Sequence, residues 1–296
     1  MDLKAYLNER RQWVDEALRR FFPEPSGFAG DVIRAMEYSL FAGGKRLRPI
    51  LCLAGARAVG GKEPDVLPMA CCFELIHTYS LIHDDLPSMD NDDMRRGKPT
   101  NHKVFGEAMA LLAGDGLLTE AFHHMATMDL PEGIEPRALL RVIGLVAQAA
   151  GYGGMVGGQA VDIQLEGKEV DSSLVEFIHT HKTGALISAS VTAGAILGGG
   201  GDHQVDAITS YGQKIGLSFQ IADDILDIEG DSRITGKGVG GDARKGKLTY
   251  PAVLGLDRSK AIQRELVEMA ICSLAVFDQK ADPLRHIAQY IIERRR

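Results

Sequence analysis

Long apolar segments separated by short polar breaks dominate the hydrophobic pattern of this chain. None of these segments shows the sustained alternation of apolar and polar residues that is typical of a half-buried strand. The breaks are rich in Gly, Pro, Asp and Asn. The pattern predicts helices over residues 68–84, 106–128, 139–150, 173–197 and 205–228. Because no strand-rich block and no low-complexity linker interrupts it, we expect one all-α domain over residues 1–296, a single helical bundle.

The beginning of the chain fits an amphipathic helix, since Leu3, Leu7 and Leu18 recur at helical spacing. Its charged residues leave no apolar core of the kind found in signal peptides. Two uncharged stretches, 142–161 and 183–201, are long enough to cross a bilayer, but several glycines interrupt both. We expect core helices that pack closely through small residues, and no membrane span.

Composition narrows the possible functions. The 296 residues include 33 Lys and Arg and 40 Asp and Glu, a net charge of −7, which argues against nucleic-acid binding as the main task. Cys52, Cys71, Cys72 and Cys272 show no zinc-type spacing, and adjacent cysteines do not easily form a disulfide. Reduced cysteines are typical of a cytoplasmic protein, which is the location we expect.

Two clusters of aspartates, each near the end of a predicted helix, are the strongest chemical signal. Carboxylates at this density repel one another, and burying them without partners is costly. Mg²⁺ removes this cost because it takes oxygen ligands and bridges to phosphate oxygens. Two clusters therefore indicate several metal ions that hold one polyanionic group. The residues are Asp84, Asp85 and Asp90 in the first cluster, and Asp223, Asp224 and Asp227 in the second.

The second cluster fits one face of a helix. Asp223 and Asp227 are four residues apart and therefore differ by roughly 40° around the helix axis. Gln220 lies three residues before Asp223 and belongs to the same stripe. These three polar side chains are expected to face one site.

The first cluster needs a change of chain direction. Asp84 and Asp90 would lie roughly 240° apart on a straight helix. Pro87 stands between them and cannot donate a helical hydrogen bond. We expect the helix to end near this proline and the chain to bring Asp90 back toward Asp84. His77 lies almost two turns before Asp84 and faces the same way, so that a ligand contact and a structural role both remain open.

Basic residues in four groups accompany the aspartates. Arg offers a planar fork for phosphate oxygens, and Lys offers a movable point charge. Each group alone is also typical of a solvated loop, and the Gly-Gly-Lys run lacks the spacing of a Walker loop. Together with the aspartates, they predict a diphosphate held by Mg²⁺ and cations. The groups are Lys45-Arg46-Leu47-Arg48, Arg95-Arg96-Gly97-Lys98, His181-Lys182-Thr183, and the glycine-rich segment 235–247 with Lys237.

Taken in order, these motifs resemble those of the trans-isoprenyl diphosphate synthases. The resemblance covers about residues 30–255 and rests on Gly43-Gly44-Lys45-Arg46-Leu47-Arg48-Pro49, both aspartate clusters, Arg95-Arg96-Gly97, Lys182-Thr183-Gly184, Phe219-Gln220-Ile221-Ala222-Asp223-Asp224 and Thr235-Gly236-Lys237. It implies the isoprenoid synthase fold, antiparallel helices around a deep central cavity, usually as a homodimer. The implied activity is an Mg²⁺-dependent condensation of isopentenyl diphosphate with an allylic diphosphate, such as dimethylallyl or geranyl diphosphate, that releases diphosphate.

The resemblance also implies roles for individual residues. It implies about three Mg²⁺ ions, with Mn²⁺ as a possible substitute, and its main metal ligands are Asp84, Asp90 and Asp223. Secondary ligands or holders of water are Asp85, Asp224 and Asp227. The clamp for isopentenyl diphosphate is Lys45, Arg48, His77 and Arg96. The contacts to the allylic diphosphate are Arg95, Lys182, Gln220 and Lys237, with Thr183 beside them.

Three other functions are weighed against this one. A class I terpene cyclase also uses an aspartate-rich motif on helices, but it needs neither the second cluster nor cations such as Lys45 and Arg48. A metal-dependent phosphohydrolase is suggested by His83 next to Asp84, but it needs further histidine ligands. A noncatalytic helical scaffold would not need both aspartate clusters.

Product length is the least constrained property. The resemblance places size control just before the first cluster, at Tyr79 and Ser80. Ser80 lies roughly 40° and Tyr79 roughly 140° from Asp84 around the helix, so geometry alone does not make Tyr79 the cavity floor. An aromatic residue next to a small one favours farnesyl diphosphate, with geranylgeranyl diphosphate as the alternative. Tyr79 packing only against a neighbouring helix is the structural alternative.

Two further segments are expected to close over bound substrate. The segment 231–247 is rich in glycine, yet its Lys237 must reach a phosphate. The three arginines at 294–296 are expected to close over the isopentenyl side in the same way.

Overall fold

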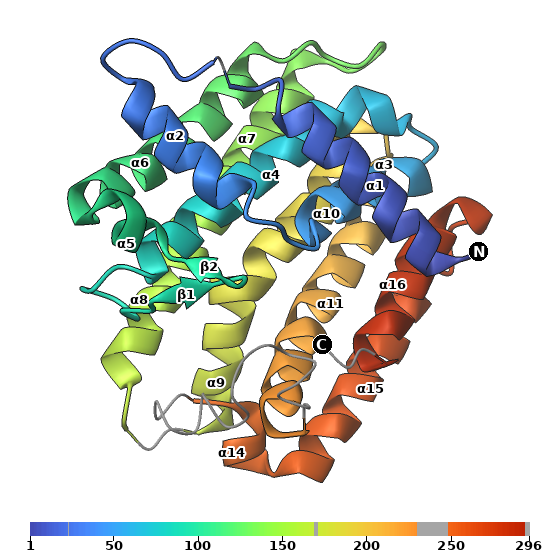
Figure 1. Ribbon diagram of the computed structural model, residues 1–296. Helices are drawn as coiled ribbons and strands as arrows, with labels where there is room; N and C mark the ends of the chain where they lie inside the picture. The colour runs from blue at the N-terminus through green and yellow to red at the C-terminus, as the bar shows by residue number, and fades with distance from the viewer. Residues whose placement is uncertain (23, 169–170, 230–247, 294–296) are drawn as a thin grey trace.

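Helices make up nearly all of the regular structure (Figure 1). The computed structural model describes residues 1–22, 24–168, 171–229 and 248–293. Its helices up to residue 165 are α1 (Leu3–Leu18), α2 (Gly30–Leu40), α3 (Leu47–Ala58), α4 (Glu63–Asp84), α5 (Asn101–Phe105), α6 (Glu107–Thr127), α7 (Pro136–Ala150) and α8 (Met155–Leu165). The later ones are α9 (Ser172–Ile178), the π-helix η1 (His179–Gly184), α10 (Ala185–Leu197), α11 (Asp202–Glu229), α14 (Tyr250–Leu254), α15 (Leu256–Ser273), the 3₁₀ turn η2 (Gln279–Ala281) and α16 (Asp282–Glu293).

The predicted all-α class is confirmed. Within the described ranges, strands are limited to the antiparallel pair β1 (Met94–Arg95) and β2 (Lys98–Pro99). The predicted helix over 173–197 is interrupted, because the chain passes from α9 through the π-helical turn η1 before α10 begins. Wider i→i+5 hydrogen bonding of this kind is frequent at functional sites, and hydrophobic spacing does not reveal it.

Helix α10 lies at the centre of the bundle, between α3, α7 and α11 (Figure 1). Every residue from Ala189 to Leu197 is buried. A side chain at Gly194 would overlap the carbonyl group of Cys52 on α3, and one at Gly55 would overlap the carbonyl of Val191 on α10. The two helices therefore approach each other through small residues, as the sequence predicts for this stretch.

Two helical stretches, Glu63–Asp84 and Pro136–Leu165, are long and apolar enough to cross a membrane, judged by length and composition alone. The first is 67% buried inside the bundle, where α4 packs against α3 and α6. Burial within the protein accounts for its apolar composition, since a helix that is apolar all round is typical of the core of a large domain.

The close contact of α3 and α10 yields a stability prediction. We expect Gly194→Ala to lower the free energy of unfolding by about 1–3 kcal/mol, because the new methyl group meets a backbone carbonyl that cannot move freely. Gly201→Ala is the control, since a side chain there meets open space, and it should change stability by less than about 0.5 kcal/mol. Urea unfolding of both variants measures the difference, and equal stabilities would contradict the packing argument.

Candidate active site

The first aspartate cluster turns back on itself, as the sequence predicts. Helix α4 ends at Asp84, and the backbone N–H of Asp90 donates a hydrogen bond to the carbonyl oxygen of Asp84 at 2.8 Å. The N–H of Asn91 donates to the carbonyl of Leu86 at 3.1 Å. Asn91 has a positive φ of 50°, a conformation that asparagine tolerates better than most residues. This tight loop brings Asp90 next to Asp84.

A cavity of about 520 Å³ opens beside Asp84. Polar groups line its mouth, including Arg48, His77, Asp84 and Lys182. Its remaining wall is largely apolar and comes from α4, α6, α8 and the loop after α4. The residues are Tyr79, Leu81, Leu86, Met89, Leu111, Met155, Val156, Ala160 and Ile163. Ser80, His83, Ser88, Gln159 and Thr183 complete the lining. A charged mouth over an apolar body suits a molecule with an anionic head and a hydrocarbon tail.

Asp84 has a perturbed acidity. Burial raises the pKa of its carboxyl group to about 6, with Lys182 acting in the opposite direction and Asp90 adding to the increase. A cation bound at this carboxylate would offset both causes of the increase, because it favours the ionised form. The donor set is therefore one that fits a hard divalent cation such as Mg²⁺.

Asp85 and Arg95 are bound to each other. The Nε of Arg95 donates to both carboxylate oxygens of Asp85 at 2.8 Å, and one terminal nitrogen lies 2.6 Å from Oδ1. The Asp85 side chain is 4% exposed, whereas that of Arg95 is 26% exposed. In this arrangement the Asp85 carboxylate faces the arginine, which it holds near the cavity.

The second aspartate cluster presents two different faces. Asp224 is buried and accepts hydrogen bonds from the N–H of Tyr250 at 2.9 Å and from the ring of His179, whose Nε2 lies 2.7 Å away. Asp223 and Asp227 are only half buried, on another face of α11. Asp224 therefore holds α14 and η1 against α11, and its two neighbours remain accessible from outside the core.

The π-helix η1 carries further predicted residues to the same place. The hydroxyl of Thr183 donates to Oε1 of Gln220 on α11 at 3.0 Å. Lys182 forms an ion pair with Asp162 of α8, with Nζ and Oδ2 2.6 Å apart. The side chains of Asp162, Lys182, Thr183 and Gln220 line a small pocket of about 80 Å³. Lys182 and Thr183 also line the cavity at Asp84. Residues of η1 thus line both the cavity at Asp84 and the pocket at Asp224.

Arg48 is a half-buried cation that lines the cavity at Asp84. Within the described residues its Nε is buried and has no hydrogen-bond partner. Burial lowers the pKa of its guanidinium to about 10, while Glu74 raises it and Arg96 lowers it. Burial, followed by repulsion from Arg48 and Arg96, also holds the pKa of His77 well below its usual value, which favours the neutral imidazole. Such a group of cations is a ready site for a polyanion.

Two basic loops lie against each other. The guanidinium of Arg96 donates to the carbonyl oxygen of Gly43, and a side chain at Gly44 would meet the same guanidinium. Lys45 follows in this loop and lines a different cavity of about 650 Å³, between α1, α3, α11 and α16. Lys237, the glycine-rich segment 231–247 and the arginines at 294–296 lie outside the described residues.

Four residues of the site were missed by the sequence reasoning. Gln159 and Asp162 come from α8, where Gln159 lines the cavity with a buried Oε1 that has no partner among the described residues. His179 and Tyr250 hold Asp224. The run Gly157-Gly158-Gln159 with Asp162 three residues later places two polar side chains on one helical face, and this spacing is a signal that could have found them.

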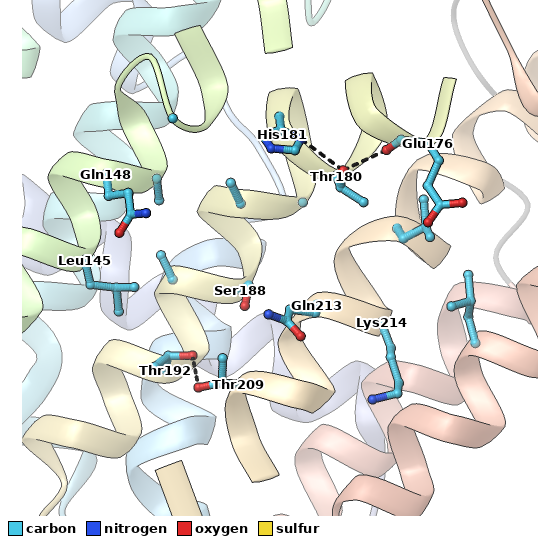
Figure 2. A pocket seen from close by; sticks show the side chains of 17 residues that line it. Leu145, Gln148, Glu176, Thr180, His181, Ser188, Thr192, Thr209, Gln213 and Lys214 are labelled. Atoms are coloured by element: carbon cyan, nitrogen blue, oxygen red, sulfur yellow. Dashed lines mark hydrogen bonds between the residues drawn. The ribbon is translucent and has the colours of Figure 1, made fainter. Parts of the chain in front are cut away.

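A further cavity of about 530 Å³ lies between α7, η1, α10, α11 and α15 (Figure 2). Gln148, His181, Gln213 and Lys214 are among its lining residues, and Thr192 and Thr209 share a hydrogen bond at its wall. Of the basic residues predicted for the site, only His181 lines it within the described part of the chain. It shares only η1 with the cavity at Asp84, because Thr180 and His181 face one cavity whereas Lys182 and Thr183 face the other.

The residues fit metal ions that are shared with a ligand. Over the described ranges, no three His, Cys, Asp or Glu side chains gather closely enough to hold one ion alone. Asp84 and Asp90 lie together, and Asp223 is close enough to influence the charge of Arg48 at the cavity mouth. Carboxylate donors that are too few for a closed site suit Mg²⁺, which keeps waters and takes phosphate oxygens.

An all-helical bundle with carboxylates and cations around an apolar cavity is the architecture of a prenyltransferase. Residues 31–285 match the family model "Polyprenyl synthetase". The chain belongs to the polyprenyl synthetase family.

Individual relatives cover nearly the whole chain. It is 50% identical over 295 residues to farnesyl diphosphate synthase of Geobacillus stearothermophilus, covering 99% of this chain and 98% of that one. It is 47% identical to the chloroplastic heterodimeric geranylgeranyl pyrophosphate synthase large subunit 1 of Arabidopsis thaliana. That match covers 99% of this chain and 80% of the relative. The crystal structure of geranylgeranyl pyrophosphate synthetase from Pyrococcus horikoshii superposes with a TM-score of 0.90 at 32% identity, covering 99% of this chain and 98% of that one.

The two aspartate clusters yield a prediction about turnover. Asp84→Ala and Asp223→Ala should each lower kcat by at least about two orders of magnitude, because each removes a carboxylate from the charged mouth. Folding should survive, since the change relieves repulsion or burial of charge. Asp206→Ala, an exposed aspartate on the same helix α11 as Asp223, is the control. Near-normal turnover of a folded Asp84→Ala protein would rule out this role.

Proposed function

We propose that the chain condenses isopentenyl diphosphate with dimethylallyl and geranyl diphosphate to form farnesyl diphosphate, the reaction of a geranyltranstransferase. The observation that carries the proposal is that one cavity joins the acidic Asp84 loop to Arg48, whose buried Nε has no hydrogen-bond partner among the described residues. A diphosphate with bound cations satisfies both groups at once. The apolar body of the cavity suits the growing hydrocarbon chain.

The residues can be divided between two diphosphates. Arg48, His77 and Arg96 form one group of interacting side chains, which we assign together with Lys45 to isopentenyl diphosphate. Lys182 and Gln220 lie around η1 and α11, and we assign them with Arg95 and Lys237 to the allylic diphosphate. Mg²⁺, when bound at Asp84, Asp90, Asp223 and Asp227 and held indirectly by Asp85, neutralises charge on the leaving diphosphate.

The chain's own groups then control the reaction. The C–O bond of the allylic diphosphate breaks as cations stabilise the leaving group. The allylic cation is attacked by the double bond of isopentenyl diphosphate, and the proton lost from the adduct passes to an oxygen of the released diphosphate. The oxygens of Thr183 and Gln220, joined by their 3.0 Å hydrogen bond, are assigned to stabilise the cation. The apolar wall excludes water that would quench it.

Product length is assigned to the wall beside Asp84. Tyr79 is 6% exposed, lines the cavity, and stacks edge-on against His83 with ring centroids 5.7 Å apart. Ser80 also lines the cavity. A large ring held in place by a neighbour supports closure at farnesyl diphosphate. Geranylgeranyl diphosphate is the second candidate, supported by the similarity to synthases of that product.

We propose a cytoplasmic homodimer. Neighbouring helices α6, α7 and α8 expose Leu112, Leu140 and Val156 at 54%, 66% and 50%, which supports an apolar interface. Leu111 and Val156 also belong to the cavity wall, so a second copy on this face would cover the cavity side. Three of the four cysteines are buried free thiols, in keeping with a reducing compartment. Sedimentation of the purified protein tests the dimer.

A product assay tests the function. The purified chain with Mg²⁺, isopentenyl diphosphate and geranyl diphosphate should yield farnesyl diphosphate and one diphosphate per condensation, and chelation should abolish both. A cyclic hydrocarbon would indicate a terpene cyclase, and phosphate without a longer chain would indicate a phosphohydrolase. Either result would overturn the proposal, as would no product with any allylic primer.

The cavity wall yields a prediction about chain length. Tyr79→Ala should lengthen the product by one or more five-carbon units and keep the condensation rate within about tenfold, because it removes a ring from the wall and leaves the charged groups in place. Tyr79→Phe keeps the ring and should leave the product unchanged. Chromatography of the dephosphorylated products measures both. An unchanged product from Tyr79→Ala would move size control to another helix.

A further inference from the structure

Arg46 lies between two cations of the proposed isopentenyl clamp, Lys45 and Arg48, but its own side chain points elsewhere. Its Nε donates to Asp15, one terminal nitrogen donates to Glu74, and the other donates to the carbonyl oxygen of Leu40, each at 2.7 Å. All three guanidinium nitrogens are therefore engaged. The Arg46 side chain is 1% exposed and cannot reach a ligand in the cavity.

These contacts join three helices at one point. Asp15 belongs to α1, Leu40 ends α2, and Glu74 belongs to α4. Arg46 itself is the residue before α3, in a left-handed conformation with φ of 52°. That conformation costs a residue other than glycine about 1–2 kcal/mol. The charge-assisted hydrogen bonds offset this cost, so the side chain fixes the backbone turn.

The left-handed turn at Arg46 sets the position of the isopentenyl clamp. Gly43 and Gly44 precede it with φ of 100° and 144°, and glycine gives the backbone little rigidity of its own. Arg48 lies in the first turn of α3. In this turn the N–H of Ile50 donates a hydrogen bond to the carbonyl oxygen of Arg46 at 3.0 Å. The position of the clamp thus depends on an anchor one or two residues away.

Glu74 connects the anchor with the clamp electrostatically. Burial has the largest effect on the pKa of Arg48 and opposes its ionisation. The carboxylate of Glu74 has the largest effect that favours ionisation. Burial also acts against the charge of Arg46, but Glu74 and Asp15 more than offset it and raise the pKa of Arg46. The single buried carboxylate of Glu74 therefore favours the charged form of both arginines.

We infer that Arg46, Asp15 and Glu74 form a positioning triad, which sets the geometry of Lys45 and Arg48 for isopentenyl diphosphate without touching that substrate. The inference rests on the proposed assignment of Lys45 and Arg48 to isopentenyl diphosphate. The triad is a device for placement rather than for stability, because replacing a buried ion pair by apolar residues of similar size is often neutral for folding.

A role in placement predicts a change in substrate binding without a loss of stability, and this can be tested. The double variant Arg46→Met/Glu74→Leu removes the buried charges together and should remain folded, with a melting temperature close to that of the natural chain. Its KM for isopentenyl diphosphate should rise by about 10- to 100-fold, since misplacement of a clamp by about 1 Å has effects of this size. The KM for geranyl diphosphate should change by less than about twofold, and kcat at saturation by less than about threefold. Arg46→Lys should resemble the double variant, because an ammonium group cannot span the three acceptors.

A matched control is available in the same pair of helices. Arg10 of α1 pairs with Glu63 of α4 at 2.7 Å, away from the basic loops. Arg10→Met/Glu63→Leu removes a comparable link between α1 and α4 and should leave both KM values unchanged. Calorimetric titration with isopentenyl diphosphate alone gives a second readout that does not depend on turnover.

Arg48→Ala separates the inference from the function on which it rests. If Arg48→Ala raises the KM for isopentenyl diphosphate but the folded Arg46→Met/Glu74→Leu protein keeps the natural value, the positioning role is overturned and the clamp stands. If Arg48→Ala leaves this KM unchanged, the clamp assignment fails, and the triad's role fails with it. A rise in the KM of the control pair would also overturn the inference, because it would show a general effect of loosening α1.

Discussion

Burial of charge at one end of an apolar bundle is the constraint on which the rest of this structure depends. Asp85 is matched by Arg95, Asp162 by Lys182, Asp224 by His179 and Glu74 by Arg46. Each pair joins different helices or a helix to a loop, so the pairs that lower the cost of burial also fix the shape of the site. Asp84 and Arg48 are exceptions, since neither forms an ion pair with the described residues, and burial displaces the pKa of each toward its neutral form. The chemistry of the prenyltransferase is expected at these exceptions.

Much of this arrangement could be predicted from the sequence, because the spacing of residues carries it. Pro87 predicts the end of α4, and the return of Asp90 to Asp84 follows from the need to keep two carboxylates on one ligand. The separation of four residues between Asp223 and Asp227 places them on a common face of α11. Glycine at 194 predicts the close approach of α10 to another helix, although not that the other helix is α3.

The remaining features depend on contacts between distant residues. Spacing shows that Asp85 and Arg95 are near the site, but only the folded chain shows that they bind each other. A stretch of six residues is too short for its hydrophobic spacing to distinguish a π turn from α turns, so η1 could not be separated from its flanking helices. Arg46 looks like one more cation of a basic run, and its orientation away from the cavity depends on acids 31 and 28 positions away. The roles of the individual site residues stay predictions.

The π-helix has a consequence for how this chain tolerates changes in length. A π turn holds one more residue than an α turn before the next hydrogen bond closes. Residues after η1 are therefore out of phase with those before it, which lets Lys182 and Thr183 face one cavity while α10 keeps its buried surface. Loss of one residue between Ile178 and Ala185 would restore regular α turns without rotating α9 against α10, because the wider turn holds the extra residue, but it would move the side chains of η1 itself. Such a deletion would therefore preserve helicity and the packing of Gly194 on α3, but it would disrupt contacts made by η1, such as that of His179 with Asp224.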